Sequence, residues 1–161
     1  MGLPTISLVD AQTLDAVTVL FEMQLREHEI TSSRDNLHTV AQKVIADRRY
    51  GFMLVASASD GTPIGAAYAS ALLSLEHGGV SGWLEELYVL PQWRGRGSGS
   101  RLIAEVIARA KESGWRALDL EVEASINVRS RCTLGINFNL ILGADFPEFF
   151  EKGLAHQTTG R

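Results

Sequence analysis

The stretch LPQWRGRGSGSRLIAEVIARA, residues 90–110, constrains the fold more than any other part of the chain. Before it, the largely apolar segment 80–91 ends at a proline, which cannot continue a central strand. Three glycines within five residues follow, and apolar residues then recur at helical spacing over 98–114. This order predicts a strand, a glycine-rich loop and an amphipathic helix that begins at the loop.

A loop of this kind is suited to holding phosphate groups. The first turn of a helix leaves backbone N–H donors unpaired, and the helix dipole favours an anion beside them. Gly95, Gly97 and Gly99 carry no side chains that would keep a pyrophosphate at a distance, and Arg94 and Arg96 add positive charge. The alternative is a loop whose glycines serve only a tight turn.

Two common phosphate-binding designs do not match the loop. The nucleoside triphosphate loop requires a lysine followed by Ser or Thr, and no lysine occurs between Met53 and Ala110. A dinucleotide fold requires G-x-G-x-x-G after the first strand, whereas here the spacing is G-x-G-x-G and several elements precede it.

The rest of the chain divides into short elements with no internal repeat or linker. Together they predict one α/β domain of the α+β kind over residues 1–154, with a disordered tail at 155–161. We expect a mixed sheet of six to seven strands with about four helices, in the order β-α-α-β-β-β-α-β-α-β-β. Besides the elements around the loop, the segments are strands at 5–9, 52–59, 62–75, 116–124 and 149–154, and helices at 11–29, 31–51 and 126–135.

Composition excludes several classes of function. The formal net charge of −4 and the pI of about 5.5 leave no basic face for nucleic acid. No apolar run reaches the roughly 18 residues of a membrane span. The single cysteine, Cys132, cannot form an internal disulfide, and the four histidines are not at metal-ligand spacing. We therefore expect a cytoplasmic protein without a metal site, a membrane segment or a nucleic-acid partner.

The segment LYVLPQWRGRGSG, residues 87–99, resembles the acyl-coenzyme A loop of the GNAT N-acetyltransferase superfamily, and the order of elements is similar as well. The resemblance implies acetyl-CoA as cosubstrate and a small-molecule amine as acceptor. In this family the strand before the loop separates from its parallel neighbour, and its exposed backbone pairs with the pantetheine arm. The implied cofactor-binding residues are Leu87, Tyr88, Val89, Arg94, Gly95, Arg96, Gly97, Ser98, Gly99, Ser100, Asn127 and Ser130.

Acetyl transfer to an alkylamine requires a base, because only about one such amine in a thousand is neutral at pH 7. Glu85 and Glu86 are the candidates, and as neighbours on one strand they are expected to point to opposite faces, so that only one reaches the site. The alternative is that both pair with arginines. LEELYV, residues 84–89, resembles the polyamine acetyltransferase branch, which implies that Glu85 is the base.

One family feature is missing from this chain. A tyrosine in a short helix often protonates the departing thiolate in the family, but here Leu134 occupies its place in NVRSRCTLGINF, residues 127–138. Asn127 matches the pattern, and Ser130 stands at its alanine position. Either water or another group protonates the thiolate, or the chain is a weak or altered catalyst.

The acceptor is the least constrained partner. The resemblance places residues 26–36 at the acceptor pocket, where Glu27, Glu29 and Asp35 are candidates to attract an ammonium group, although a solvated helix end would carry the same residues. We expect an amine N-acetyltransferase acting by direct attack. The alternatives are a non-catalytic acyl-coenzyme A-binding regulatory module and a protein N-acetyltransferase. The apolar segment 138–150 suggests a homodimer.

Overall fold

The computed structural model describes residues 2–124 and 128–135. The described part contains three α-helices, two short 3-10 turns and one six-stranded sheet. Its elements in chain order are β1 (Thr5–Leu8), α1 (Leu14–Glu27), α2 (Arg34–Ala46), η1 (Arg48–Tyr50), β2 (Gly51–Ser57), β3 (Pro63–Ser74), β4 (Gly79–Val89), η2 (Pro91–Trp93), α3 (Ser98–Glu112), β5 (Ala117–Ala124) and β6 (Val128–Gly135).

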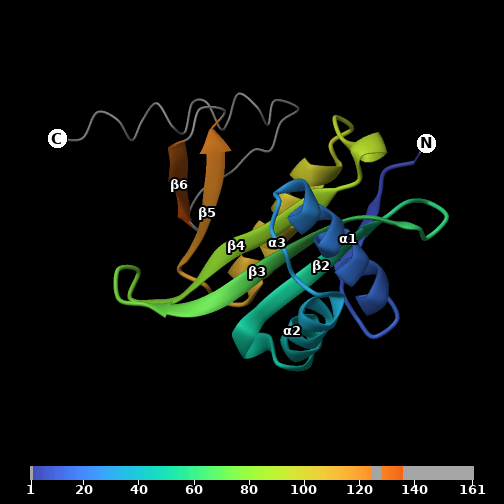
Figure 1. Cartoon of the computed structure of the whole chain (residues 1–161). Coiled ribbons are helices and arrows are strands. Elements are labelled where there is room, and N and C mark those ends of the chain that lie inside the picture. Colours follow the sequence, from blue (N-terminus) through green and yellow to red (C-terminus); the bar gives the residue numbers. More distant parts are fainter. Residues whose placement is uncertain (1, 125–127, 136–161) are drawn as a thin grey trace.

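The strands lie in the sheet in the same order as in the chain. All neighbours are antiparallel except β4 and β5, which are parallel and are joined through α3. A parallel pair needs such a crossover, because the chain must return to the same end of the sheet. Helices α1 and α2 cover one face of the sheet and α3 covers the other (Figure 1).

Two apolar layers result from this arrangement. Along β2, Leu54 packs towards α3 while its neighbour Val55 packs towards α1 and α2, and both side chains are fully buried. The run from Phe52 to Ala56 is therefore apolar without alternation, as expected for a strand covered on both faces. Leu102 and Val106 of α3 fill the first layer.

Local signals account for several boundaries. The Ser33 hydroxyl caps α2 by accepting the Asn36 N–H at 3.2 Å. The β2–β3 hairpin turns at Asp60-Gly61, where Gly61 has a φ of 85° and the Asp60 carboxylate accepts the Thr62 N–H at 2.9 Å. This turn lies between the two strands predicted at 52–59 and 62–75.

The prediction of a helix at 126–135 was wrong, because residues 128–135 form strand β6. β6 pairs antiparallel with β5, from Ala117 opposite Gly135 to Ala124 opposite Val128. A short segment with mixed propensity takes the structure that its neighbour offers, and here the edge of β5 offers a full ladder of hydrogen bonds. The described residues thus hold three α-helices instead of about four.

The expected strand at 149–154 and the tail at 155–161 lie outside the described residues, so the extent of the domain stays a prediction. Among the described helices, none combines the length and the apolar character needed to cross a membrane.

Candidate active site

The parallel strands β4 and β5 are paired only over a short stretch. Their register runs from Gly82 opposite Leu118 to Leu84 opposite Leu120, after which β4 continues to Val89 and β5 to Ala124 without further pairing between them. The two strands diverge beyond this point (Figure 1). The separation implied by the family resemblance is therefore present, and beyond Leu84 this edge of β4 pairs with no other strand among the described residues.

A β-bulge lies at the point of divergence. Tyr68 of β3 faces Glu86 and the next residue, Ala69, faces Leu84, so Glu85 is the extra residue. The prediction that Glu85 and Glu86 point to opposite faces was wrong, because a bulge interrupts the alternation of side chains and re-aims the inserted one. The Ser70 hydroxyl donates to the Glu85 carboxylate at 2.7 Å, which places Glu85 on the face of the sheet that Tyr68 and Glu86 share.

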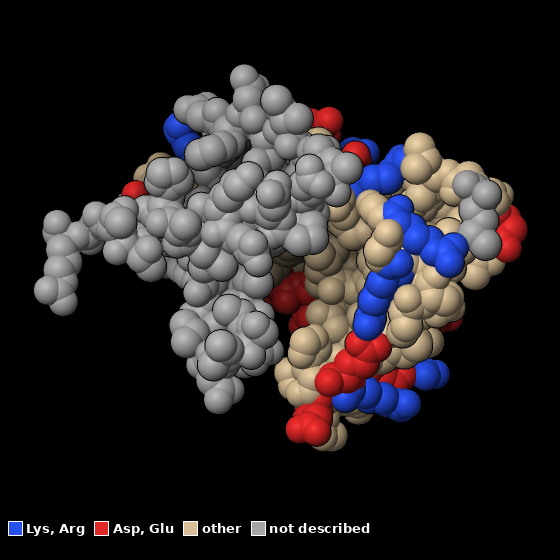
Figure 2. Space-filling view, turned by 90° about the horizontal axis from the view of Figure 1, so that it is seen from above, with Lys and Arg blue, Asp and Glu red and all other residues tan. Residues whose placement is uncertain are grey.

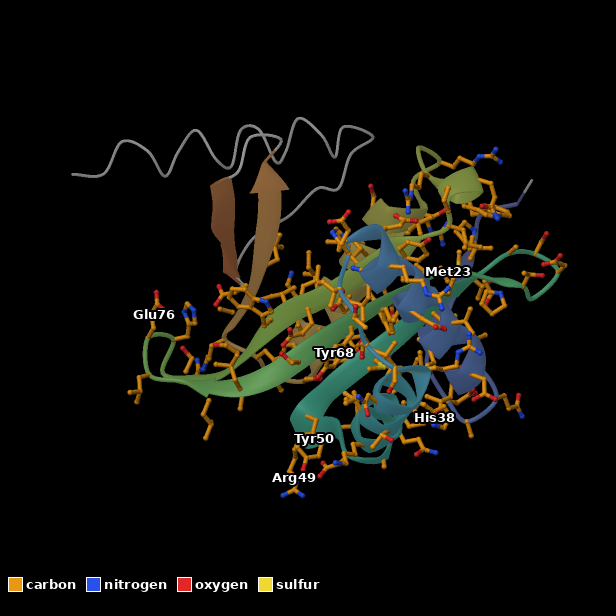
Figure 3. All side chains as sticks on the ribbon, in the orientation of Figure 1. Met23, His38, Arg49, Tyr50, Tyr68 and Glu76 are labelled. Carbon is orange, nitrogen blue, oxygen red and sulfur yellow. The ribbon has the colours of Figure 1, made fainter. Side chains whose placement is uncertain are left out.

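The two carboxylates differ in their surroundings. Glu85 is exposed, whereas Glu86 is partly buried beside Tyr68 on the face covered by α1 and α2. Burial raises the pKa of the Glu86 carboxyl, the Glu85 carboxylate raises it further, and His28 lowers it. Burial and then Glu85 also raise the pKa of Tyr68, whose ring lies over the middle of the sheet (Figure 3).

The edge of β4 offers backbone groups to a ligand. The Leu90 N–H donates to the Ile64 carbonyl of β3 at 2.9 Å. Backbone groups alternate in direction along a strand, so those of Val89 and Leu87 point away from β3, towards the side that β5 has left. These are residues that the family resemblance assigns to cofactor binding.

The glycine-rich loop reaches the N-terminus of α3 in a left-handed conformation. Gly95 and Gly97 have φ values of 69° and 80°, which residues with side chains rarely adopt. The first backbone bond within α3 joins the Arg101 N–H to the Gly97 carbonyl at 3.1 Å. The amides of Ser98, Gly99 and Ser100 precede this bond, and they form the free helix end that an anion can bind.

Ser98 itself faces the protein interior. It is 2% exposed, and its hydroxyl has no hydrogen-bond partner among the residues that the structure describes. Contact with a phosphate at this position would come from its backbone N–H, since the side chain points into the core.

Arg94 contacts three neighbouring protein groups, from α1 and β4. Its guanidinium donates from Nη2 to the Glu27 carboxylate at 2.7 Å and from Nε to the Val89 carbonyl at 2.8 Å. It also lies 5.3 Å from the centre of the Tyr88 ring. The Tyr88 hydroxyl donates to the other oxygen of Glu27 at 2.8 Å. The hydrogen bond from Arg94, and then that from Tyr88, lower the pKa of Glu27.

The end of α1 positions the predicted acceptor residues. The Ile30 N–H bonds back to the Leu25 carbonyl at 2.8 Å and the Glu29 N–H to the Arg26 carbonyl at 3.1 Å, the two bonds of a Schellman motif. Glu29 takes the left-handed position of this motif, with a φ of 58°. It is exposed, as is Asp35 in the first turn of α2. Of the three predicted acceptor residues, Glu27 is the one held by Tyr88 of β4 and by Arg94 of the loop.

Two predicted cofactor-binding residues, Asn127 and Ser130, belong to the segment after β5. Asn127 lies outside the described residues, and Ser130 lies in β6 with its backbone opposite Val122. Leu134 is likewise in β6, opposite Leu118, and not in a helix. Sequence reasoning missed Tyr68, Ser70 and His28, because their proximity to the two glutamates depends on strand register and on the end of α1.

The charges of the site are arranged in two groups. Figure 2 shows acidic side chains recessed below the surface, next to a row of basic side chains on the face seen from above. Glu85 and Glu86 form the acidic pair on β4, while Arg94 and Arg96 belong to the loop, where Arg96 lies 5.8 Å from the centre of the Trp93 ring.

Diverging parallel strands beside a glycine-rich helix end form the arrangement that the resemblance to N-acetyltransferases implies. The model of the acetyltransferase (GNAT) family matches residues 17–132, and the chain belongs to this family. Acetyl-CoA is the cosubstrate of the family, and relatives have been crystallised with it.

Similar proteins agree with this assignment. The aminoglycoside N(6')-acetyltransferase type 1 of Stenotrophomonas maltophilia is 36% identical over 98 residues, which is 59% of this chain and 63% of that protein. The match thus spans less than two thirds of the relative. A GNAT family acetyltransferase from Brucella melitensis, solved with acetyl-CoA, has a TM-score of 0.63 at 21% identity, covering 84% of this chain and 89% of its own.

A third similar structure is an integron cassette protein from the mobile metagenome of Cole Harbour Salt Marsh. Its TM-score is 0.69 at 18% identity, over 76% of this chain and 86% of its own. Likenesses at this level of identity support the fold.

Proposed function

We propose that this protein transfers an acetyl group from acetyl-CoA to an amino group of a small polyamino compound, with Glu86 as the general base. The observation that carries the proposal is the bulge in β4. It brings two carboxylates to one face where β4 and β5 diverge, and burial raises the pKa of the less exposed one, Glu86. A carboxylate whose pKa is raised accepts a proton more readily than one with an ordinary pKa.

The residues around the loop suit acetyl-CoA. Free amides at the N-terminus of α3 would hold the pyrophosphate, and the exposed edge of β4 at Leu87 and Val89 would pair with the amides of the pantetheine arm. When bound, acetyl-CoA supplies a thioester carbonyl that a neutral amine can attack. In this role Glu86 takes the proton that the amine must lose, and the Val89 N–H polarises the carbonyl.

An acceptor with more than one amino group fits the pair of carboxylates. Glu85 is exposed and held by Ser70, so it is placed to bind a second ammonium group while Glu86 acts on the first. Aminoglycosides are the first candidates, because the relative from Stenotrophomonas maltophilia is an aminoglycoside acetyltransferase. Polyamines, suggested by LEELYV, carry the same repeated cationic groups.

The test is the pH profile of kcat/KM for Glu86→Gln and Glu85→Gln. We expect Glu86→Gln to lower kcat/KM by about 10²- to 10⁴-fold at neutral pH, the usual contribution of a general base. Glu85→Gln removes a negative charge that raises the pKa of Glu86, so its activity should persist to lower pH than that of the wild type, with a higher KM for the amine.

The opposite result has a clear meaning. If Glu85→Gln loses activity and Glu86→Gln retains it, the base is Glu85, as the polyamine branch implies. The assay should measure thiol release against aminoglycosides, diamines, polyamines and amino acids.

A non-catalytic acyl-coenzyme A-binding module is the second candidate, favoured by the strand at 128–135, where the family often has a tyrosine-bearing helix. It requires acetyl-CoA binding without thiol release on any amine of the panel. A cytoplasmic location, a homodimer through 138–150 and cofactor contacts from Asn127 and Ser130 stay predictions.

A further inference from the structure

Glu27 is the residue that joins the two halves of the proposed site. It ends α1, next to the residues predicted to receive the acceptor, and its two carboxylate oxygens are bound by Tyr88 of β4 and Arg94 of the loop. One carboxylate on the acceptor side therefore neutralises a cation on the phosphate side.

The contacts of Arg94 compete with its predicted role. Arg94 donates from Nε to the Val89 carbonyl and from Nη2 to Glu27, and its guanidinium lies over the Tyr88 ring. The Val89 carbonyl is one of the groups on the free edge of β4. Two of its five N–H groups are engaged in these bonds, and its positive charge is already balanced by Glu27, so a phosphate would compete with Glu27 for this charge.

The pair is weak enough to exchange. The side chain of Arg94 is 47% exposed and that of Glu27 is 43% exposed. Ion pairs with this exposure contribute little to stability, so a doubly charged pyrophosphate at the end of α3 can draw the arginine away. Tyr88 would continue to hold Glu27 in place through its own hydrogen bond.

We propose that Glu27 is a shared counter-ion: it binds Arg94 in the free protein and an ammonium group of the acceptor once the coenzyme's phosphates have taken Arg94. The inference rests on the proposed function. What it adds is a coupling between the two sites: bound coenzyme leaves a carboxylate free for the acceptor.

The proposal has a reciprocal consequence. If coenzyme binding frees Glu27 for the amine, then amine binding strengthens coenzyme binding by the same factor, because the two equilibria form a closed cycle. Removing either member of the pair should abolish this coupling, and the two variants should shift the separate affinities in opposite directions.

The experiment is calorimetric titration with coenzyme A, which binds without reacting, and with kanamycin and spermidine as amine probes. Glu27→Gln should bind coenzyme A about two- to five-fold more tightly than the wild type, the range that an exposed ion pair supports. Arg94→Gln should bind coenzyme A more weakly than the wild type. In the absence of coenzyme A, it should bind the amine probes more tightly than the wild type.

Glu112→Gln is the matched control, because it removes one negative charge at the far end of α3, where Glu112 is 67% exposed. It should leave both affinities at wild-type values. Thermal unfolding of each variant verifies that it is folded.

The outcomes separate this inference from the proposed function. Unchanged or weaker coenzyme A binding by a folded Glu27→Gln overturns the shared counter-ion and leaves the acetyltransferase assignment in place. A wild-type protein that binds no coenzyme A overturns both. If neither amine probe binds the wild-type protein saturated with coenzyme A, the role of Glu27 as the counter-ion of the acceptor is overturned.

Discussion

At the scale of single residues, Glu29 is held in an unfavourable backbone conformation. Among the described residues it alone has a side chain and a positive φ, 58°, at the position where a Schellman motif usually has glycine. Such strain is retained where the surroundings demand the residue, and it is concentrated at functional sites. This supports the proposal that Glu29 contributes to acceptor binding, beside Glu27 and His28.

Glu29→Gly should therefore stabilise the protein while impairing its function. We expect about 1 kcal/mol of added stability, a rise of about 2–4 °C in Tm, because glycine adopts a positive φ without steric cost. The KM for the amine should rise, while the affinity for acetyl-CoA stays the same.

Glu29→Gln separates the two effects, since it removes the charge and keeps the strained conformation. It should raise the KM for the amine without raising Tm. A lower Tm for Glu29→Gly would show that the side chain stabilises the end of α1, contrary to this interpretation.

At the scale of elements, the turn into α3 requires glycine at position 97 for its backbone conformation, whereas the lack of a side chain at Gly99 matters less. A Cβ added at Gly97 would meet no atom within 4 Å, and at Gly99 only the Val89 side chain at 3.9 Å. Space is therefore available at both positions, but Gly97 has a φ of 80° and Gly99 lies inside the helix.

Gly97→Ala should destabilise the protein by about 1–2 kcal/mol, the cost of a left-handed conformation for a residue with a Cβ. Gly99→Ala is the matched control, and it should leave Tm unchanged or slightly raised, because alanine has the higher helix propensity. Thermal unfolding of the two variants measures the difference. Equal losses in both would indicate that packing, and not backbone conformation, governs this turn.

The bulge in β4 is the second decisive element. It places Glu85 and Glu86 on one face, beside Tyr68, at the residue where pairing with β5 ends. A regular strand would have sent one carboxylate towards α3, into the apolar layer around Leu102. Because of the inserted residue, the side chains of Glu85 and Glu86 lie on the same face of the sheet.

At the scale of the whole molecule, Glu86 links the proposed site to global stability. Its pKa is raised in the folded protein, mainly by burial, so the folded state binds more protons than the unfolded state between the unfolded value and the raised one. Stability is consequently lost as the pH rises through that window, which begins near the unfolded value of about 4.3.

Glu86→Gln should therefore unfold at a higher temperature than the wild type at pH 8, and at the same temperature at pH 4, where the wild-type carboxyl is protonated. Unfolding at the two pH values measures the effect, with Glu112→Gln as the control for a lost charge. A variant that is less stable at pH 8 would mean that the ionised carboxylate has stabilising partners that outweigh its burial.

Much of the architecture follows from local patterns. The strand that ends at Pro91, the loop of Gly95, Gly97 and Gly99, and the helix after it were predictable, because proline, glycine and helical periodicity act on their own neighbours. The hairpin at Asp60-Gly61 is another example. The segment 128–135 was not predictable in this way, since its strand exists only through pairing with β5.

The sequence by itself determined the family, the mixed sheet and the identity of the two acids, because these depend on residue types and spacings along one segment. Tertiary structure alone decided that Glu85 and Glu86 share a face, that Tyr68 and Ser70 join them, and that Arg94 binds Glu27. Each of these features depends on how different elements are placed against one another, through strand register and through the position where α1 ends. Local propensity carries no information on either.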